Sequence, residues 1–513
     1  MKVPTFFGML ALGGAWFAVL GLGAGAQDPT APTAAPEAAA PLLNGPSSVL
    51  PGAGAAPASP NDRGQTKKEL PRPYKELFFN NDFGYLDAPG YVSHDPFDAL
   101  KRIDVGPRTL LDVGGEYRLR FHDEDNVRLN GRGNDYLLQR ARLYGDWRHD
   151  DWLRFYAELI DSNISFNRLP PRPSEVDRAD LDNLFFEVKL AEDGAGGELW
   201  TRVGRQEIDR GSQRLLGSAE WANDRNTFDG VKALWKSRTW DVDAFWTRPV
   251  PFALTGSGDD RNFRPADWTE QFMGVFASWH EVKDQTVDLY FFRLERDRRV
   301  VRGDLPLVPF DANTFGGRWL GRQGDWLWEG EGGCQFGRFS GAEQTGGFAT
   351  IGAGRQWRCL PWKPTAWIYY DWASGDADPN NHHHGTFNQL FPQAHRYLGL
   401  SDVVGRQNIE DWNFLFTTKP CDRVTLLAEG HIFRLAQARD AFYGTGGNVV
   451  RIDPTGAAGS DVGQEVDFSV RARLTLHAEL LVTYGHFSTG SFLARTGAGS
   501  NADFVYTQLG FKF

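Results

Sequence analysis

Arginine recurs in this sequence at alternate positions, so that two guanidinium groups share one face of an extended segment. Arg118 and Arg120 form one such pair, and Arg140 and Arg142 form another. A guanidinium carries a permanent positive charge and a planar fork of N–H donors that fits a carboxylate. These residue types could therefore bind carboxylate-bearing anions. The candidates found by their position on polar faces are Arg118, Arg120, Arg140, Arg142, Arg154, Arg318, Arg471 and Arg473.

The segments that carry these arginines alternate apolar and polar residues, which is the period of a strand with two different faces. In residues 110–121, Val113 and Tyr117 lie opposite the two arginines, and residues 137–147 and 463–475 repeat the pattern. A sandwich interior cannot be this ionic, because buried unpaired charge costs several kcal/mol. The solvated outer face of a sandwich remains an alternative for any single strand.

The number of such segments and the lengths of their connections favour a barrel. Long polar connections such as 163–180 and 374–407 alternate with short turns such as 237–238 and 419–421. An even-numbered antiparallel meander with long loops at one rim and short turns at the other is typical of an outer-membrane barrel, whereas a sandwich gives no reason for it. The eighteen predicted strands lie near 110–121, 135–148, 152–162, 181–190, 199–208, 227–236, 239–248, 270–280, 285–295, 312–321, 325–337, 345–355, 364–373, 408–418, 422–434, 463–475, 477–487 and 502–513.

The ends of the strands also favour a membrane. The last predicted strand ends in Phe513, an aromatic ending that resembles the C-terminal signature of bacterial outer-membrane barrels. Tryptophans gather near strand ends, as in the aromatic girdles at the two membrane–water interfaces. We therefore predict an all-β chain that forms a transmembrane, up-and-down, antiparallel β-barrel of about 18 strands. These tryptophans are Trp147, Trp152, Trp235, Trp240, Trp279, Trp319, Trp326, Trp357, Trp362 and Trp412.

The N-terminal sequence predicts targeting and linker segments ahead of the barrel. Residues 1–26 combine Lys2, an apolar stretch and an Ala-Gly-Ala ending, which predicts a secretory signal peptide; a membrane anchor is the alternative. Residues 27–76 are rich in Pro and Ala and predict a disordered linker. We assign residues 77–107 to a periplasmic N-terminal segment and residues 108–513 to the barrel.

Composition excludes several other classes of protein. The 55 Lys and Arg residues face 66 Asp and Glu residues, a formal charge of −11, which argues against nucleic acid as a partner. Three widely spaced cysteines give neither a disulfide framework nor a zinc pattern. No run after residue 30 approaches the ~20 apolar residues of a membrane-spanning helix.

Metal-binding and catalytic patterns are weak. Asp376, Asp378 and Asn380 alternate like the start of a calcium loop, but the Gly at the sixth position and the distal Glu are missing. No nucleophile elbow, P-loop or HExxH motif occurs. We therefore expect no metal site beyond this calcium candidate, no cofactor and no enzymatic activity.

Several motifs resemble the alginate export family of outer-membrane proteins. They are Val-Gly-Arg-Gln-Glu-Ile at 203–208, Gly-Ser-Gln-Arg-Leu-Leu at 211–216, Arg-Asn-Thr-Phe-Asp-Gly at 225–230 and Phe-Asn-Gln-Leu-Phe-Pro at 387–392. The resemblance spans about residues 108–513. It implies an eighteen-stranded barrel with an electropositive constriction that passes an anionic uronate polymer.

The resemblance adds Arg205 and Arg214 to the candidates for the lumen. Arg205 lies two residues after Val203 and therefore on the same, apolar face of the strand, so a bulge would be needed to turn it inward. Family members can carry a long periplasmic turn that plugs the pore, whereas the turn expected at residue 476 is very short. Any plug would have to come from a rim loop or from residues 61–107.

Together these features predict a monomeric channel in the outer membrane of a Gram-negative-type bacterium, surrounded by outer-membrane lipid. Its predicted function is the passive export of an alginate-like anionic polysaccharide along weak arginine–carboxylate sites, fed by periplasmic export machinery. Lumen charges that only pair with one another and stiffen the wall are the alternative at each arginine. A general anion or nutrient porin of the same fold is the second functional reading, and a barrel enzyme acting on lipid or polysaccharide is a third.

Overall fold

The computed structural model describes residues 74–93, 95–252, 263–297, 300–302, 305–378 and 380–513. All of these residues belong to one compact unit. The predicted signal peptide, and the predicted linker up to residue 73, lie outside the described residues.

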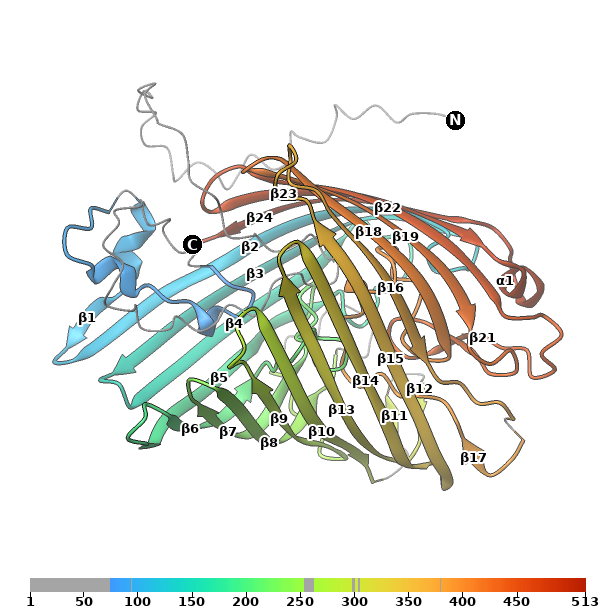
Figure 1. Cartoon of the computed structure of the whole chain (residues 1–513), viewed down its shortest axis with the longest axis horizontal. Coiled ribbons are helices and arrows are strands. Elements are labelled where there is room, and N and C mark those ends of the chain that lie inside the picture. The colour runs from blue at the N-terminus through green and yellow to red at the C-terminus, as the bar shows by residue number, and fades with distance from the viewer. Residues whose placement is uncertain (1–73, 94, 253–262, 298–299, 303–304, 379) are drawn as a thin grey trace. The chain divides into compact units, whose positions relative to one another are not determined.

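Eighteen strands follow one another around a closed antiparallel barrel (Figure 1). Each of these long strands pairs with the next one, and β24 (Ala502–Lys512) pairs with β2 (Thr109–Asp125) to close the ring. The predicted fold and the predicted number of strands are thus confirmed. The other strands of the ring are β3 (Gly133–His149), β4 (Leu153–Ser165), β5 (Asp177–Glu192), β6 (Glu198–Gln206), β7 (Thr227–Lys236), β8 (Trp240–Val250), β9 (Glu270–Trp279), β10 (Gln285–Arg296), β13 (Phe310–Gln323), β14 (Trp326–Phe339), β15 (Ala342–Gln356), β16 (Thr365–Ala373), β18 (Ile409–Cys421), β19 (Val424–Leu435), β22 (Asp461–Arg473) and β23 (Ala478–Thr489).

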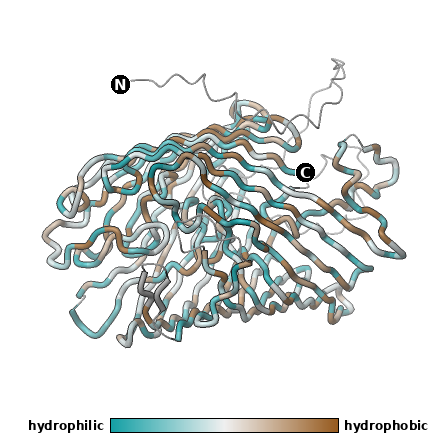
Figure 2. Tube along the Cα trace, turned by 180° about the vertical axis from the view of Figure 1, so that it is seen from behind, coloured by the Kyte–Doolittle hydropathy of each residue, from teal (hydrophilic) through white to brown (hydrophobic). Residues whose placement is uncertain are grey.

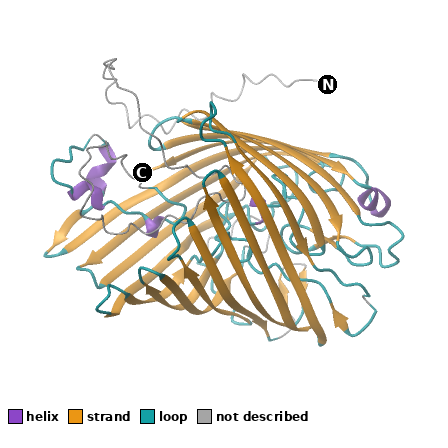
Figure 3. Cartoon of the chain, viewed as in Figure 1, coloured by secondary structure: helices purple, strands orange, loops and turns teal. Residues whose placement is uncertain are grey.

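The remaining elements are short and lie before or between the strands of the ring (Figure 3). Strand β1 (Ile103–Gly106) pairs with the start of β2, and β17 (His383–His384) pairs in parallel with β15. Two small hairpins are β11 (Val300–Arg302) with β12 (Leu305–Leu307), and β20 (Phe442–Tyr443) with β21 (Val449–Arg451). The helices are η1 (Phe78–Asn80), η2 (Gly84–Asp87), η3 (Pro96–Leu100), η4 (Ala394–Arg396) and α1 (Ser491–Thr496). None of the described helices has the length and apolar character needed to cross a membrane.

Each strand of the ring has an apolar outer face and a polar inner face, as the period of two predicts. Arg118 and Arg140 are buried on the inside, whereas Tyr117 and Leu143 are 46% and 51% exposed on the outside. The same alternation of hydrophobic and hydrophilic residues runs along the strands in Figure 2. An exposed apolar band of this size is stable next to lipid tails, while the polar groups inside can pair with one another.

The connections alternate in length as predicted. Residues 474–477 form one of the short turns, and residues 207–226 and 374–408 form two of the long loops at the other rim. The hairpin between β14 and β15 is an exception, because it turns within Ser340 and Gly341, both at positive φ. That conformation matches the twist of the paired strands and allows a two-residue turn.

The N-terminal segment sits at the rim of the short turns. Within η3, whose first turn is capped by the Asp95 carboxylate, Phe97 lies 4.8 Å from the His477 ring and 5.4 Å from the Phe513 ring, centroid to centroid. Leu77, Phe78 and Phe79 pack in a separate buried cluster against inward-facing aromatic residues of three strands. This segment therefore enters the barrel from the short-turn end. The strand aromatics of the cluster are Tyr144, Tyr156 and Phe185.

Candidate functional site

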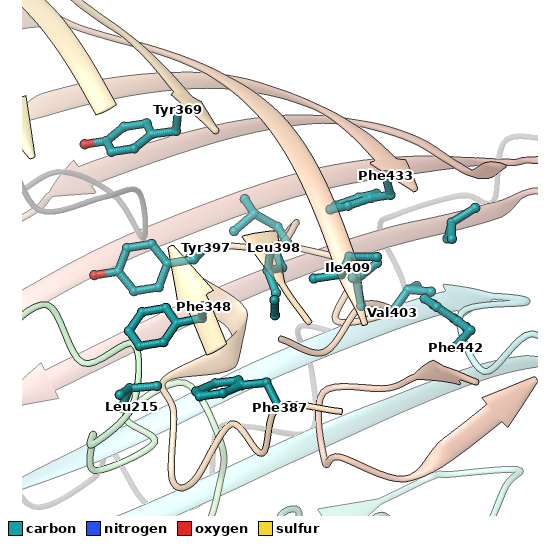
Figure 4. Packing of buried hydrophobic residues seen from close by; sticks show 14 of the residues in the cluster. Leu215, Phe348, Tyr369, Phe387, Tyr397, Leu398, Val403, Ile409, Phe433 and Phe442 are labelled. Carbon is teal, nitrogen blue, oxygen red and sulfur yellow. The ribbon is translucent and has the colours of Figure 1, made fainter. Parts of the chain in front are cut away.

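Two long loops from the opposite rim fold into the barrel and lie side by side. Residues 207–226 connect β6 to β7, and residues 385–408 lead into β18. The Gly217 N–H donates to the Phe391 carbonyl (2.8 Å), and the Phe391 N–H donates to the Leu215 carbonyl (2.9 Å). Apolar side chains of both loops and of the wall pack around this contact (Figure 4). A rim loop, one of the two expected sources of a plug, thus fills much of the lumen.

Trp221 connects the two loops to the barrel wall at β2. Its ring stacks on His395 with 3.6 Å between centroids, and its indole N–H donates to the Asp402 carboxylate. The Arg120 guanidinium covers the Trp221 ring at 3.5 Å from the centroid. Arg120 also donates to the Gln508 amide oxygen (2.8 Å).

Arg118 and Arg120 form no ion pair with a carboxylate among the described residues. Arg118 donates to the carbonyls of Glu220 (2.9 Å) and Ala222 (2.7 Å). Both guanidinium groups are buried on the inner face of β2. Carbonyl and amide oxygens therefore take the place of carboxylates as the hydrogen-bond partners of these two guanidinium groups.

Arg140 and Arg142 instead belong to a network of ion pairs. The Arg140 guanidinium contacts Glu116 at 2.6 Å and Glu220 at 2.9 Å. The Arg142 guanidinium contacts Glu158 at 2.6 Å, and further carboxylates lie within 4 Å of it. At Arg140 and Arg142 the geometry therefore matches the alternative interpretation, in which charged side chains of the lumen pair with one another and stiffen the wall. The further carboxylates around Arg142 are Asp182, Glu207 and Glu220.

A second network joins loop 207–226 to the wall at β14. Arg214 contacts Glu329 at 2.8 Å and Glu331 at 2.9 Å. Arg318 contacts Asp288 at 2.6 Å and also reaches Glu329 at 3.8 Å. Burial lowers the pKa of Arg214, but Glu329 and Tyr397 raise it more, so the pKa lies well above its usual range.

A small space remains beside Arg214. Its volume is about 10 Å³, roughly the space for one water molecule, and it is lined by Arg214, Gln389, Tyr397, Arg406 and their neighbours. One Arg406 N–H group points into this region without a hydrogen-bond partner in the described part of the chain, while the other end of the guanidinium pairs with Asp371. Two guanidinium groups and the Gln389 amide thus border this small space together with apolar side chains.

Arg205, Arg471 and Arg473 do not join these networks. Arg205 pairs with Leu184 in regular register, without the bulge that would turn it inward, and its guanidinium contacts Asp229 at 2.7 Å. Arg471 and Arg473 are the last inward-parity residues of β22, next to the turn at 474–477, so they lie at the short-turn rim. Arg471 contacts the exposed Glu479 at 3.3 Å.

Arg154 is also a member of an ion-pair network. It contacts Asp146 at 2.7 Å and Glu187 at 2.9 Å, and donates to the Phe79 carbonyl. It therefore holds the inserted N-terminal segment against the wall.

Several cationic residues of the lumen were not singled out by the sequence, among them Lys232, Arg225 and Arg406. Lys232 is 3% exposed on the inner face of β7, with no ion-pair partner among the described residues. Arg225 and Arg406 come from the two loops and pair with Glu207 and Asp371. The alternation along its strand could have placed Lys232 on the inner face, whereas the irregular loops have no period from which to place Arg225 and Arg406.

Glu76 places a negative charge close to this cationic region. Burial raises the pKa of its carboxyl, but Arg396, Lys512 and Arg225 lower it more, and a hydrogen bond with Gln213 lowers it further. The pKa therefore lies below its usual range. The N-terminal segment thus brings one carboxylate to the lumen cations from the short-turn side.

The calcium candidate does not form a ligand cluster in the described residues. The Asp376 carboxylate accepts from the Asp378 N–H (3.1 Å), and the Asp378 carboxylate accepts from the Asn380 N–H (3.3 Å). These hydrogen bonds stabilise the turn that the residues themselves form. In the described part of the chain, groups with metal-ligand spacing lie elsewhere, at Glu429, His431 and Asp467 and at Glu158, Asp182 and Glu207.

Comparison with known proteins agrees with this geometry. The model of the family described as "Alginate export" matches residues 109–507, which is nearly the whole barrel. The chain belongs to the alginate export family. No curated protein matches the chain.

Solved barrels of Pseudomonas aeruginosa share the fold of this alginate export family member. OprD has 8% sequence identity and a TM-score of 0.51, covering 79% of this chain and 94% of its own. OccK3 (OpdO) has 12% identity and a TM-score of 0.51, covering 78% and 96%. OccK2 (OpdF), solved in complex with glucuronate, has 11% identity and a TM-score of 0.51, covering 79% and 96%. The alginate export family member is therefore an outer-membrane channel with a porin-like barrel.

Proposed function

We propose that this channel passively exports an anionic polysaccharide of the uronate type. The observation that carries the proposal is the pair of buried guanidinium groups on β2, Arg118 and Arg120, which no carboxylate of the described chain neutralises. Lys232 adds a third such cation on β7. Fixed charges in a narrow lumen favour counter-ions, and a polyuronate carries one carboxylate on every sugar.

Transport along such a lumen needs sites that bind and release. Arg118 and Arg120 would exchange carbonyl and amide contacts for a passing carboxylate, which is a stronger, charge-assisted partner. Ion-paired groups such as Arg140 with Glu116 would shape the wall without holding the polymer. If the channel exports alginate, weak successive binding sites would let the polysaccharide advance by diffusion.

A general porin for small anions is the second candidate. It is favoured by the similar barrel OccK2, whose structure holds the monomeric sugar acid glucuronate. We infer that the barrel works as a monomer and receives its substrate at the short-turn rim, where the N-terminal segment lies. Export machinery of the periplasm is the partner that this rim would meet.

Changing Arg118 and Arg120 together to Gln is expected to lower anion selectivity and to weaken block by oligouronates about ten-fold, a change of about 1.4 kcal/mol. Glutamine keeps polar donors for the loop carbonyls but removes the charge. Reversal potentials and current block of the refolded chain in planar bilayers measure both effects. Arg168→Gln, which removes an exposed arginine paired with Asp135, is the matched control.

The outcomes separate the two candidates. Loss of both selectivity and block in the double variant, with the control unchanged, supports polyuronate export. A wild-type pore that selects anions but ignores oligouronates would favour the general porin. Unchanged reversal potentials in the double variant would contradict the role of the β2 arginines.

A further inference from the structure

Four carboxylates and one imidazole meet on the inner wall, on β18, β19 and β22. Asp411 comes from β18, Glu429 and His431 from β19, and Glu465 and Asp467 from β22. The strand register pairs His431 with Glu465 and Glu429 with Asp467, which makes their side chains direct neighbours. All five are at most 4% exposed.

The distances within this acidic cluster match those between ligands of one metal ion. The His431 Nδ1 atom lies 2.7 Å from an Asp411 oxygen, and Nε2 lies 3.5 Å from a Glu429 oxygen. One ligand atom from each of Glu429, His431 and Asp467 lies within 4.8 Å of the other two. Atoms that bind a common ion at about 2.0–2.5 Å are separated by at most about 5 Å.

The charge of the acidic cluster is not balanced by the described protein. Elsewhere in the lumen, buried carboxylates such as Glu158 contact an arginine. In the acidic cluster His431 is the only residue of basic character in ion-pair contact with a carboxylate, as far as the described chain extends. Since a buried ion without a counter-charge destabilises the fold, this site favours an added cation.

Buried oxygen atoms without partners point to the same place. The Asn413 Oδ1 atom has no hydrogen-bond partner among the described residues, although the Asn413 amide nitrogen contacts Glu429 and His431. The Ser401 hydroxyl and one Asp467 oxygen are likewise unpartnered. Both lie 2.6 Å from the position that a Cβ on Gly485 would occupy, so they converge on the space that this glycine leaves open. The donors that reach the cluster, such as the backbone N–H of Ser401 on Glu465, are neutral, so buried carboxylates and a neutral amide oxygen gather here without a cation from a Lys or Arg of the described chain, which is the chemistry of a cation site.

We propose that Glu429, His431 and Asp467 bind one divalent transition-metal ion, of the class of Zn²⁺ or Mn²⁺. A set of one imidazole and several carboxylates suits these ions, whereas Ca²⁺ and Mg²⁺ prefer oxygen alone. Asp411 would accept the Nδ1–H of His431, which fixes the tautomer and leaves the Nε2 lone pair to the metal. The metal would there replace the Asn413 amide nitrogen, which lies 3.0 Å from Nε2. This arrangement goes beyond the transport of an anion and does not depend on it.

Metal binding by the refolded full-length mature chain in detergent tests the proposal. After treatment with a chelator, titration calorimetry with Zn²⁺ is expected to give one ion per barrel, and Co²⁺ is expected to give visible absorption bands. His431→Gln and Asp467→Asn are each expected to weaken Zn²⁺ binding at least about 100-fold. The control is His486→Gln with Asp503→Asn, which removes a second His–carboxylate pair (2.9 Å) on neighbouring strands and should leave binding unchanged.

Folding of each variant is checked by the heat-dependent shift of barrel migration in gels, and Glu429→Gln replaces any variant that fails to fold. Absence of Zn²⁺ and Co²⁺ binding to the wild type would overturn the proposal. So would Zn²⁺ binding that the His431 and Asp467 variants leave unchanged. Oligouronate block is not part of this test, so failure of the transport proposal would leave its result intact.

Discussion

Replacing residues 386–404 by a six-residue Gly-Ser linker is expected to raise single-channel conductance roughly five-fold, because barrels of 16–18 strands leave an aqueous channel unless something fills them. This segment supplies His395, whose ring stacks on Trp221, and Tyr397, whose hydroxyl donates to the Ser212 carbonyl. It also supplies the backbone N–H of Ser401, which donates to Glu465 (2.8 Å) on β22. The loop thus extends between distant parts of the wall and blocks the space between them.

The measurement is current through single refolded pores in a planar bilayer at fixed salt concentration. A matched control replaces residues 454–457, a mostly exposed loop tip at the same rim, by Gly-Ser residues of equal number and should leave the conductance unchanged. Equal conductance of wild type and loop variant would show that another segment sets the limit. Loop 207–226 and the inserted Leu77–Phe79 segment would then be the next candidates.

The strands could be predicted because the membrane gives every one of them the same two faces. The predicted strand at 285–295 is Gln285–Arg296 in the structure, and the one at 227–236 is unchanged. Other strands extend further than predicted: 312–321 became Phe310–Gln323. Strand ends lie outside the lipid, where both faces are wet and the alternation fades, so the sequence marks only the membrane-embedded part.

The partners of the lumen arginines could not be predicted in the same way. Parity placed Arg118 and Arg142 on the inner face, and both are buried there. Their partners, however, come partly from loop 207–226. The Glu207 and Glu220 carboxylates lie near Arg142, whereas Arg118 contacts Glu220 only at its carbonyl. An irregular loop has no period, so only the folded chain shows which arginine it neutralises.

Arg205 shows where a motif and a strand period disagree. The motif that resembles the family favoured a place for Arg205 in the lumen. Its position two residues after Val203 puts it on the apolar face, so that an inward position would require a bulge. The pairing of Leu184 with Arg205 has no register shift, and the Arg205 side chain turns to Asp229. The strand period was therefore the better predictor at this position. Turning Arg205 inward by a shift of register would also turn every other residue of the strand to the wrong face.

Changing Arg214 to Met is expected to destabilise the folded barrel by about 3–5 kcal/mol, which is the usual cost of removing one partner of a buried ion pair. Arg214 is fully buried, and its guanidinium contacts Glu329 (2.8 Å) and Glu331 (2.9 Å) while covering the Tyr397 ring at 4.4 Å. Methionine fills similar space but leaves two carboxylates without this cation. Arg318, 3.8 Å from Glu329, is too distant to replace both contacts.

Unfolding in urea, followed by tryptophan fluorescence in detergent, measures the loss. The decisive comparison is the triple variant in which Glu329→Gln and Glu331→Gln accompany Arg214→Met. Removing the unpaired charges should restore at least half of the lost stability, since neutral amides cost less to bury than carboxylates. Destabilisation of equal size in the single and triple variants would instead assign the effect to packing of loop 207–226. Arg108→Met, at an exposed salt bridge with Asp150, serves as the control and should change stability by less than about 1 kcal/mol.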